Sequence, residues 1–328
     1  MDPQIQPSTP VLDTSVSATI PHERELARAF PMPAVVGFIS LALFAGAFCS
    51  SRIFPQHTNV VTTRAATASV ASAFTDISIN ARAAIVYDAR QQRILFEKNA
   101  NAQLPLASLT KLMLALVAFE TLPNDVNIVI TPQALSAEGD SGLTVGEIWH
   151  LQDLIDATLI PSSNDGAQAL ALSMSDESTT RAVLMMNRRA RELGLESMYF
   201  VNPTGLDESP TMAGAYASAK DVALLLAHLA QYEQAVLDGT SRDGMLLTSE
   251  SGITHEAVNT NEALGQIPGM IGGKTGYTRL AGGNLAIAFD SSVGHPIIVV
   301  VLGSTESGRF YDVRALVNAA RTHLSQSF

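Results

Sequence analysis

The sequence predicts an α+β protein in which one antiparallel sheet, flanked by helices, is closed by distant segments and carries an inserted helical region. Two observations support this fold class. Strand patterns occur near residues 83–96 and again near residues 284–302, while helical patterns dominate from Ser108 to about Leu229. The chain contains no internal repeat, so an array of repeated units is not expected.

The first predicted strands form a β-hairpin near the start of the globular part. Residues 83–87 and 93–96 have strand patterns and flank the turn-like segment 88–92. Helices follow, and the clearest helical patterns cover residues 148–160, 164–174, 180–193 and 219–230.

The last part of the chain returns to strands. Residues 284–289 and 296–302 are apolar strand-like runs, and the segment between them has the composition of a turn. A final helix is predicted over residues 310–324.

Composition limits the classes of function. The 328 residues can form one large or two ordinary domains plus tails, and 47% hydrophobic residues are enough for a sizeable core. The net charge of −11, without any basic cluster, argues against a nucleic-acid partner. Cys49 is the single cysteine and no histidine pair has metal-binding spacing, so we expect neither a disulfide framework, nor a metal, nor a cofactor.

The N-terminal region is predicted to be a membrane anchor. Residues 1–29 are polar, contain proline and lack periodicity, which is typical of disorder. Residues 30–53 contain an uncharged run between Arg28 and Arg52 that is just long enough to span a bilayer, and we interpret it as an uncleaved signal-anchor helix. Residues 54–76 are expected to be a linker to a catalytic domain over residues 77–328.

Other interpretations of this run remain open. A cleaved signal peptide would use the small residues at 45–47, although its basic forerunner of roughly thirty residues would be unusually long. A lipoprotein cysteine at Cys49 is disfavoured by the bulky Phe48 before it. The arginines on both sides do not determine the orientation.

The segment 104–120 contains the first candidate for chemistry. A helix is predicted to start near Ala107, and it should be buried on all sides because every residue from 112 to 119 is apolar. Ser108 and Lys111 lie one turn apart and can touch. Burial disfavours the charged form of the lysine, and a neutral amine beside a hydroxyl is a general base beside a nucleophile. Alternatively, the serine is an N-cap and the lysine extends to solvent.

Two later segments add polar groups. Ser162 and Asn164 lie in a tight connection between predicted helices, where helix capping alone would also explain them. Residues 272–278 precede the late strands, and their glycines would let a backbone edge approach a peptide closely. Lys274 and Thr275 offer a cation and a hydroxyl suited to a carboxylate, although a plain glycine-rich turn is the simpler interpretation.

The order Ser-x-x-Lys, Ser-x-Asn, Lys-Thr-Gly is that of the penicillin-recognising serine enzymes. On these motifs the sequence resembles the serine D-alanyl-D-alanine carboxypeptidases, the low-molecular-mass penicillin-binding proteins of the peptidase S11 family, from about residue 83 to residue 302. Further segments resemble that family's landmarks, namely 186–187, 202–207 and 259–261. The departures are Ser163, where many members have glycine, Thr204 and residues 217–218.

The resemblance implies a β-lactamase/transpeptidase-like fold and a role for each catalytic position. Ser108 would attack the carbonyl of the terminal peptide bond while neutral Lys111 accepts its proton. Ser162 would relay a proton to the leaving D-alanine.

The resemblance also implies how the substrate is bound. Asn164 would hold the peptide or place Lys111, and Lys274 with Thr275 would bind the terminal carboxylate. Gly276 and Tyr277 would complete the substrate-binding edge, with the backbone N–H groups of Ser108 and Tyr277 forming the oxyanion hole.

The expected function is removal of the terminal D-alanine from peptidoglycan stem pentapeptides, with β-lactams as covalent inhibitors. We expect the catalytic domain to face outward from a bacterial cell membrane. D,D-endopeptidase activity on crosslinks is the main alternative, because it needs the same groups.

More distant alternatives are disfavoured by particular residues. A class A β-lactamase needs a Glu-x-x-x-Asn context that neither Glu192 nor Glu196 provides. A non-catalytic penicillin sensor is disfavoured because every catalytic position is intact. A trypsin-like protease would need a matching histidine segment, an aspartate partner and usually disulfides, and a zinc peptidase would need a metal-binding pair of histidines. The sequence contains none of these.

Overall fold

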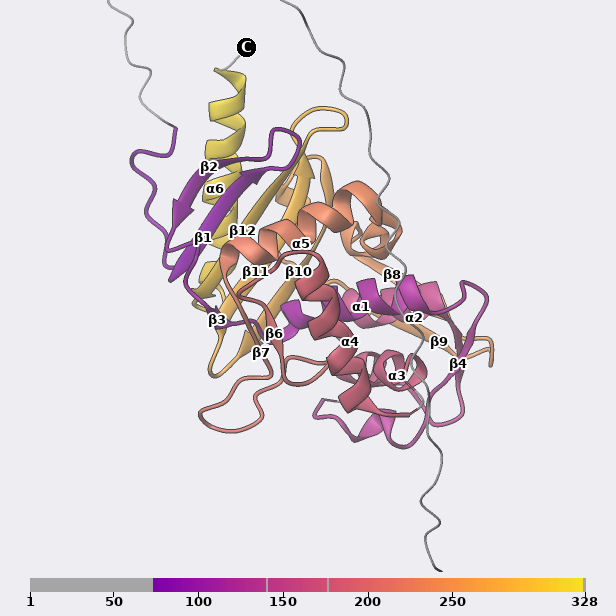
Figure 1. The fold of residues 1–328 in the computed structure, drawn as a ribbon. Helices are drawn as coiled ribbons and strands as arrows, with labels where there is room; N and C mark the ends of the chain where they lie inside the picture. Colours follow the sequence, from indigo (N-terminus) through magenta and orange to yellow (C-terminus); the bar gives the residue numbers. More distant parts are fainter. Residues whose placement is uncertain (1–72, 140, 176, 327–328) are drawn as a thin grey trace, which may run out of the picture. The chain divides into compact units, whose positions relative to one another are not determined.

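A five-stranded antiparallel sheet joins the two ends of the described chain (Figure 1). Its strand order is β10-β11-β12-β1-β2, so the N-terminal hairpin pairs with the C-terminal strands through β1 and β12. This confirms the prediction of one sheet closed by distant segments. The strands are β1 (Ala83–Asp88), β2 (Arg93–Lys98), β10 (Met270–Thr278), β11 (Gly282–Asp290) and β12 (Pro296–Ser304).

Helices cover both faces of this sheet. Helix α5 (Ala219–Tyr232) packs on one face and α6 (Gly308–Ser325) on the other, where Figure 1 draws α6 in yellow. Alternate residues of β12 belong to the two resulting cores: Val300 lies in the core with α5, whereas Val299 and Val301 lie in the core with α6. Burial on both sides explains why the late strands are continuous apolar runs.

The inserted helical region packs around one buried helix. The helices of this region are α1 (Thr110–Thr121), α2 (Leu151–Leu159), α3 (Asn164–Ser173) and α4 (Thr179–Glu192). Helix α1 contacts each of the other three, and its residues 110–118 are all buried. The prediction of a helix enclosed on all sides is therefore confirmed.

One helix boundary was predicted wrongly. Residues 148–150 form strand β5 (Ile148–His150), which pairs with β4 (Asn127–Val129), and the helix begins only at Leu151. The buried indole of Trp149 lies opposite Ile128 in this ribbon. A three-residue strand is too short to show a period of two, so the following helical pattern was extended over it.

Other short elements also escaped prediction. They are the strands β3 (Leu104–Pro105), β6 (Tyr199–Phe200) and β7 (Ala215–Ala217), the ribbon β8 (Gly244–Thr248) with β9 (Thr254–Val258), and 3₁₀ turns at Ala134–Ser136, Gln234–Val236, Asp238–Ser241 and Leu264–Gln266. Several of them border the site described below.

The computed structural model describes residues 73–139, 141–175 and 177–326. The predicted tail, the predicted membrane segment and linker residues 54–72 lie outside the described residues. Phe74 already belongs to the folded core, because its ring stacks on Phe96 of β2. No helix in the described ranges is both long and apolar enough to cross a membrane.

Candidate active site

Ser108 lies in a 3₁₀ turn (Ala107–Leu109) that leads directly into α1. Ala107 has a φ of 49°, a left-handed conformation that is unfavourable for a residue with a Cβ. Thr110 Oγ1 donates a hydrogen bond to the Ala107 carbonyl at 2.7 Å and helps to hold this turn. Strain of this kind persists where the surroundings impose it, and it often accompanies function.

Asn284 of β11 fixes the segment before the serine. Its Nδ2 donates to the carbonyls of Pro105 and Leu106 at 2.9 and 3.0 Å, and its Oδ1 accepts from the Gly303 N–H at 2.8 Å. The side chain is completely buried. The central sheet therefore holds the segment that carries Ser108 through a single amide.

Two glycines allow close approach to the same segment. A Cβ on Gly205, whose φ is +82°, would lie 1.9 Å from the Ala107 carbonyl oxygen. A Cβ on Gly276 of β10 would lie 2.9 Å from the Leu106 carbonyl oxygen and 3.1 Å from the Ser108 backbone nitrogen. The third motif's backbone thus runs against the nucleophile turn, at a distance that a side chain would prevent.

The family-like landmark at residues 202–207 builds the turn that contains Gly205. Asn202 Oδ1 accepts from the backbone N–H groups of Thr204 and Gly205, at 3.2 and 2.7 Å. Asp207 accepts from Thr278 Oγ1 at 2.9 Å, which ties this turn to the end of β10. The turn presents the Thr204 carbonyl to Lys111.

Lys111 is fully buried and has three partners. Its Nζ lies 2.8 Å from Ser108 Oγ, 2.8 Å from Asn164 Oδ1 and 3.0 Å from the Thr204 carbonyl oxygen. Burial lowers the pKa of Lys111 from 10.5 to about 7. No carboxylate is among its hydrogen-bond partners in the described part of the chain, so no opposite charge in direct contact offsets the effect of burial on this pKa.

The proton positions follow from these partners. Asn164 Nδ2 donates to the Glu138 carbonyl at 2.7 Å, so Asn164 Oδ1 faces Lys111 as an acceptor. The Thr204 carbonyl is an acceptor as well. A neutral amine has two N–H donors for these two oxygens, and its lone pair is left for the Ser108 O–H.

The second motif lies between α2 and α3. Ser163, not Ser162 or Asn164, caps α3, because its Oγ accepts from the Gly166 N–H at 2.9 Å. The capping explanation therefore does not account for Ser162 or Asn164. Ser162 has a φ of 66°, and its hydroxyl makes no hydrogen bond within the described residues.

The third motif lies on β10, which is an edge strand of the sheet, as its pairing with only β11 there shows. Lys274 is buried and its Nζ donates to the Thr275 carbonyl at 3.1 Å, while Thr275 Oγ1 lies 2.5 Å from Thr260 Oγ1. Burial and then the positive charges of Lys111 and Arg309 hold the pKa of Lys274 well below its usual value. The side chain of Tyr277 is exposed.

The structure brings part of the predicted set into direct contact. Ser108, Lys111 and Asn164 form a continuous hydrogen-bonded group. Lys274 is close enough for the charge of Lys111 to affect its pKa, but neither Lys274 nor Ser162 is hydrogen-bonded to that group in the described chain. The roles assigned to these residues stay predictions.

Sequence reasoning missed Arg309 at the start of α6. This buried side chain donates to the Gly276 carbonyl at 2.8 Å and so holds the backbone of the third motif in place. Nothing near Arg309 in the sequence marks it, because it follows the motif by more than thirty residues. Asn284 was also missed, and it was assigned only to a predicted strand.

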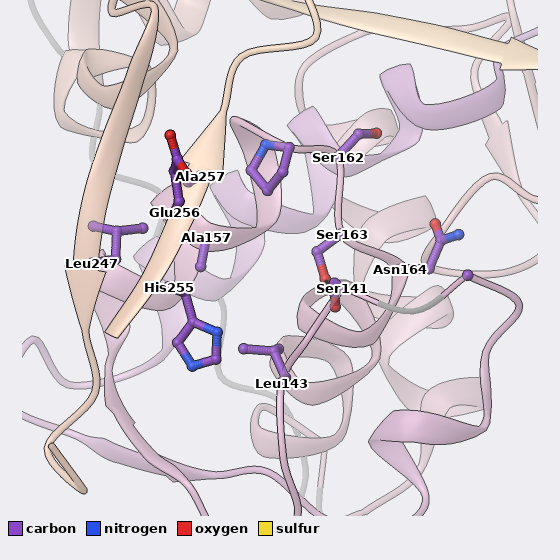
Figure 2. Close-up of a pocket in the computed structure, with 12 residues that line it drawn as sticks. Ser141, Leu143, Ala157, Ser162, Ser163, Asn164, Leu247, His255, Glu256 and Ala257 are labelled. Atoms are coloured by element: carbon purple, nitrogen blue, oxygen red, sulfur yellow. Dashed lines mark hydrogen bonds between the residues drawn. The ribbon is translucent and has the colours of Figure 1, made fainter. Parts of the chain in front are cut away.

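A pocket of about 280 Å³ lies beside the second motif (Figure 2). Ser162, Ser163 and Asn164 line one side, and Leu247 and residues 255–257 of the β8–β9 ribbon line the other. Gly139, Ser141 and Leu143 complete the wall, and Ser141 joins it to the motif because its Oγ donates to Asp165 Oδ2 at 2.8 Å.

Comparison with known proteins decides the family. The family model of the D-alanyl-D-alanine carboxypeptidases, peptidase S11, matches residues 66–306. The chain belongs to this family. All three motifs lie inside the matched range.

Two curated relatives and two solved structures are similar to this family member. D-alanyl-D-alanine carboxypeptidase DacF of Bacillus subtilis is 31% identical over 75% of this chain and 63% of its own length. DacB2 of Mycobacterium tuberculosis is 33% identical over 60% of this chain and 66% of its own length. The match thus spans less than two thirds of each relative.

The similar structures share the fold of this family. A D-alanyl-D-alanine carboxypeptidase from Mycobacterium tuberculosis has a TM-score of 0.67 and 27% identity, covering 75% of this chain and 92% of that one. Penicillin-binding protein D2 of Listeria monocytogenes, in an ampicillin-bound form, has a TM-score of 0.65 and 30% identity, covering 74% and 98%. The predicted transpeptidase-like fold is confirmed.

Removing the amide of Asn284 should slow acylation without moving the sequence motifs. In Asn284→Leu the carbonyls of Pro105 and Leu106 lose their donor, and we expect the acylation rate of Ser108 to fall about tenfold or more. The measurement is the rate of labelling by a fluorescent penicillin, with circular dichroism to verify folding.

A matched control is Asn318→Leu on the exposed face of α6, which should acylate at the original rate. If Asn284→Leu does not fold, Asn284→Asp keeps the acceptor for Gly303 and loses only the donors. Full-rate acylation in a folded Asn284 variant would show that the sheet does not position the serine.

Proposed function

We propose that the protein is a serine-type D-alanyl-D-alanine carboxypeptidase that trims peptidoglycan stem peptides. The contact of 2.8 Å between Lys111 Nζ and Ser108 Oγ carries this proposal, because the amine is buried, has no carboxylate partner in the described residues and in its neutral form can accept the hydroxyl proton. Family membership supports the same activity.

In the proposed acylation, Lys111 acts as general base. Ser108 Oγ forms a bond to the carbonyl carbon of the penultimate D-alanine, and its proton passes to Lys111 Nζ. The carbonyl oxygen takes the electron pair and is stabilised by the backbone N–H groups of Ser108 and Tyr277. The packing of Gly276 against Leu106 and Ser108 supports this pairing of donors from two segments.

Collapse of the tetrahedral intermediate breaks the peptide bond. The proton on Lys111 passes to the leaving amine of the terminal D-alanine through the Ser162 hydroxyl, which makes no hydrogen bond within the described chain. Water then attacks the ester and releases Ser108. A β-lactam would form the same ester, and the retained ring would hinder that water.

The cationic end of the cleft supports recognition of a free carboxylate. Lys274, Thr275 and Arg309 gather at the third motif, and the mutual repulsion of the cations contributes to the low pKa of Lys274. An anion bound there would relieve this repulsion. Asn164, in turn, orients Lys111 and offers its amide edge to the peptide.

Cleavage of crosslinks is a second candidate, because it needs the same atoms plus room beyond the leaving amine. The pocket beside Ser162 provides such room. Relatives of this chain from Pseudomonas aeruginosa and Escherichia coli, 29% and 28% identical, are named D-alanyl-D-alanine endopeptidases.

The activity test uses the full chain with a peptide ending in D-Ala-D-Ala. We expect release of D-alanine, and labelling by penicillin that is lost in Ser108→Ala. Ser136→Ala, a serine on an exposed turn, is the matched control and should keep both signals. Absence of D-alanine release together with absence of labelling would refute the proposal.

The pH dependence tests the base. Since the neutral form of Lys111 is the reactive one, acylation should increase as pH rises through about 7 and level off above it. The second-order rate of penicillin labelling between about pH 5 and about pH 9 measures this. Lys111→Ala should abolish labelling in a folded protein, whereas Lys220→Ala on the surface should not. A flat profile would contradict the role of Lys111.

We also propose that residues 30–53 anchor the enzyme in the bacterial cell membrane with residues 77–328 outside, where crosslinked wall lies. The length and lack of charge of this run support the proposal. In cells expressing the full chain, the protein should stay in the membrane fraction after an alkaline wash, and deletion of residues 1–53 should release it. A mature protein that begins after residues 45–47 would instead identify a cleaved signal peptide.

A further inference from the structure

Thr260 contacts segments that carry two of the catalytic motifs, although it lies outside all three. Its Oγ1 lies 2.5 Å from Thr275 Oγ1 on β10. Its backbone N–H donates to the Ile160 carbonyl at 3.3 Å, just before the segment that contains Ser162. The mechanism proposed above uses Thr275 and Ser162 but assigns no role to Thr260.

The backbone at Thr260 is held in place by contacts that do not involve its own side chain. Asn259 Nδ2 donates to the Thr240 carbonyl, and Asn259 Oδ1 accepts from the Asn261 N–H, both at 2.9 Å. Thr240 Oγ1 accepts from the Gly273 N–H of β10 at 3.0 Å. The Thr260 hydroxyl is therefore presented to β10 from a fixed backbone, and a change of this side chain leaves the backbone contacts intact.

The two threonine hydroxyls share one hydrogen bond, and either oxygen can be the donor. Neither hydroxyl makes another hydrogen bond within the described residues. If Thr260 donates, the proton of Thr275 is available to a ligand, whereas in the opposite arrangement it is already used. Because a carboxylate can only accept, a carboxylate bound at Thr275 requires Thr260 to be the donor.

Donation by Thr260 would also make Thr275 a better donor. The Thr275 side chain is only 3% exposed, so little water can replace Thr260 as its partner. Hydrogen bonds in a chain polarise one another, and the effect is largest where water is excluded. A hydrogen bond received by Thr275 Oγ1 also limits the directions in which its own O–H can point.

We propose that Thr260 is a positioning residue for recognition of the free chain end. Its hydroxyl donates to Thr275 Oγ1, so that the Thr275 proton is directed at the terminal carboxylate of the substrate. This inference rests on the proposed function, because that function places the carboxylate at Thr275. Thr260 does not touch the substrate in this arrangement, and it serves carboxylate binding rather than the chemistry at Ser108.

The kinetic test removes the hydroxyl and compares two peptides with the same acyl part, one ending in D-Ala-D-Ala as the free acid and one ending in its amide. Thr260→Val keeps a similar shape and the N–H that contacts Ile160. We expect kcat/KM for the acid to fall about fivefold, mainly through KM, because one hydrogen bond to the carboxylate ligand is lost. Cleavage of the amide should not change, and Thr260→Ser should restore the original values for the acid. An unchanged rate with the acid, or an equal loss with both peptides, would overturn the proposal.

The chain offers a matched control in a second pair of threonines. Thr248 and Thr254 of the β8–β9 ribbon are exposed, and their hydroxyl oxygens lie 2.9 Å apart. Thr254→Val removes the same kind of contact away from the third motif and should leave both peptides unaffected.

A double-variant cycle shows whether Thr260 acts through Thr275. Once Thr275→Val has removed the proposed carboxylate ligand, adding Thr260→Val should cause no further loss of kcat/KM for the acid. Losses that simply add would contradict the relay through Thr275.

A binding measurement separates this proposal from the proposed function. Full-chain Ser108→Ala cannot form an acyl-enzyme, and calorimetric titration with the acid and the amide measures what the carboxylate contributes to affinity. Adding Thr260→Val should lower the ratio of acid to amide affinity about fivefold, whether or not the original protein releases D-alanine. An acid that binds no better than the amide, or a ratio that Thr260→Val does not change, would eliminate the role of Thr260. Release of D-alanine alongside either result would leave the carboxypeptidase proposal intact.

Discussion

The site depends on keeping one amine out of water. A pKa lowered from 10.5 to about 7 means that burial disfavours the charged form of Lys111 by roughly 5 kcal/mol. Helix α1 provides this burial, because α2, α3 and α4 pack against it and residues 110–118 are all buried. The same local sequence on a solvent-exposed helix would not lower the pKa of the lysine, because its amine would stay hydrated.

The segments that enclose Lys111 also supply its hydrogen-bond acceptors. A buried amine without hydrogen bonds would be costly, and Lys111 receives two acceptors from different parts of the chain. The Asn164 amide is oriented by the Glu138 carbonyl, and the Thr204 carbonyl is presented by the turn that Asn202 builds. Because both partners can only accept, they leave the amine lone pair for Ser108.

The central sheet fixes the nucleophile relative to the substrate edge. Asn284 of β11 holds the backbone before Ser108, and Arg309 of α6 holds the Gly276 carbonyl of β10. Both supports are buried and both come from the C-terminal half of the chain. The N-terminal hairpin reaches this half by pairing β1 with β12, so closing the sheet also completes the site.

The sequence was sufficient to predict the features that have a regular hydrophobic pattern or a catalytic motif. The buried helix after Ser108, the paired terminal strands and the edge position of Lys274 were all predictable, because long apolar runs and ordered motifs are strong signals. Strand β5 and the other two- or three-residue strands were not, because their pairing depends on distant partners. Asn284 and Arg309 carry no local signal, since an amide in a strand and an arginine in a helix are ordinary until the fold places them.

The two buried lysines have low pKa values for different reasons, and the difference separates their roles. Burial alone lowers the pKa of Lys111, whereas the charges of Lys111 and Arg309 add to burial at Lys274. A substrate carboxylate beside Lys274 would oppose that repulsion and favour the ammonium form there. The same substrate would exclude more water from Lys111 and keep it neutral. Substrate binding would thus make Lys274 the cation that binds the carboxylate and Lys111 the neutral general base. The two lysines differ in role because their environments differ.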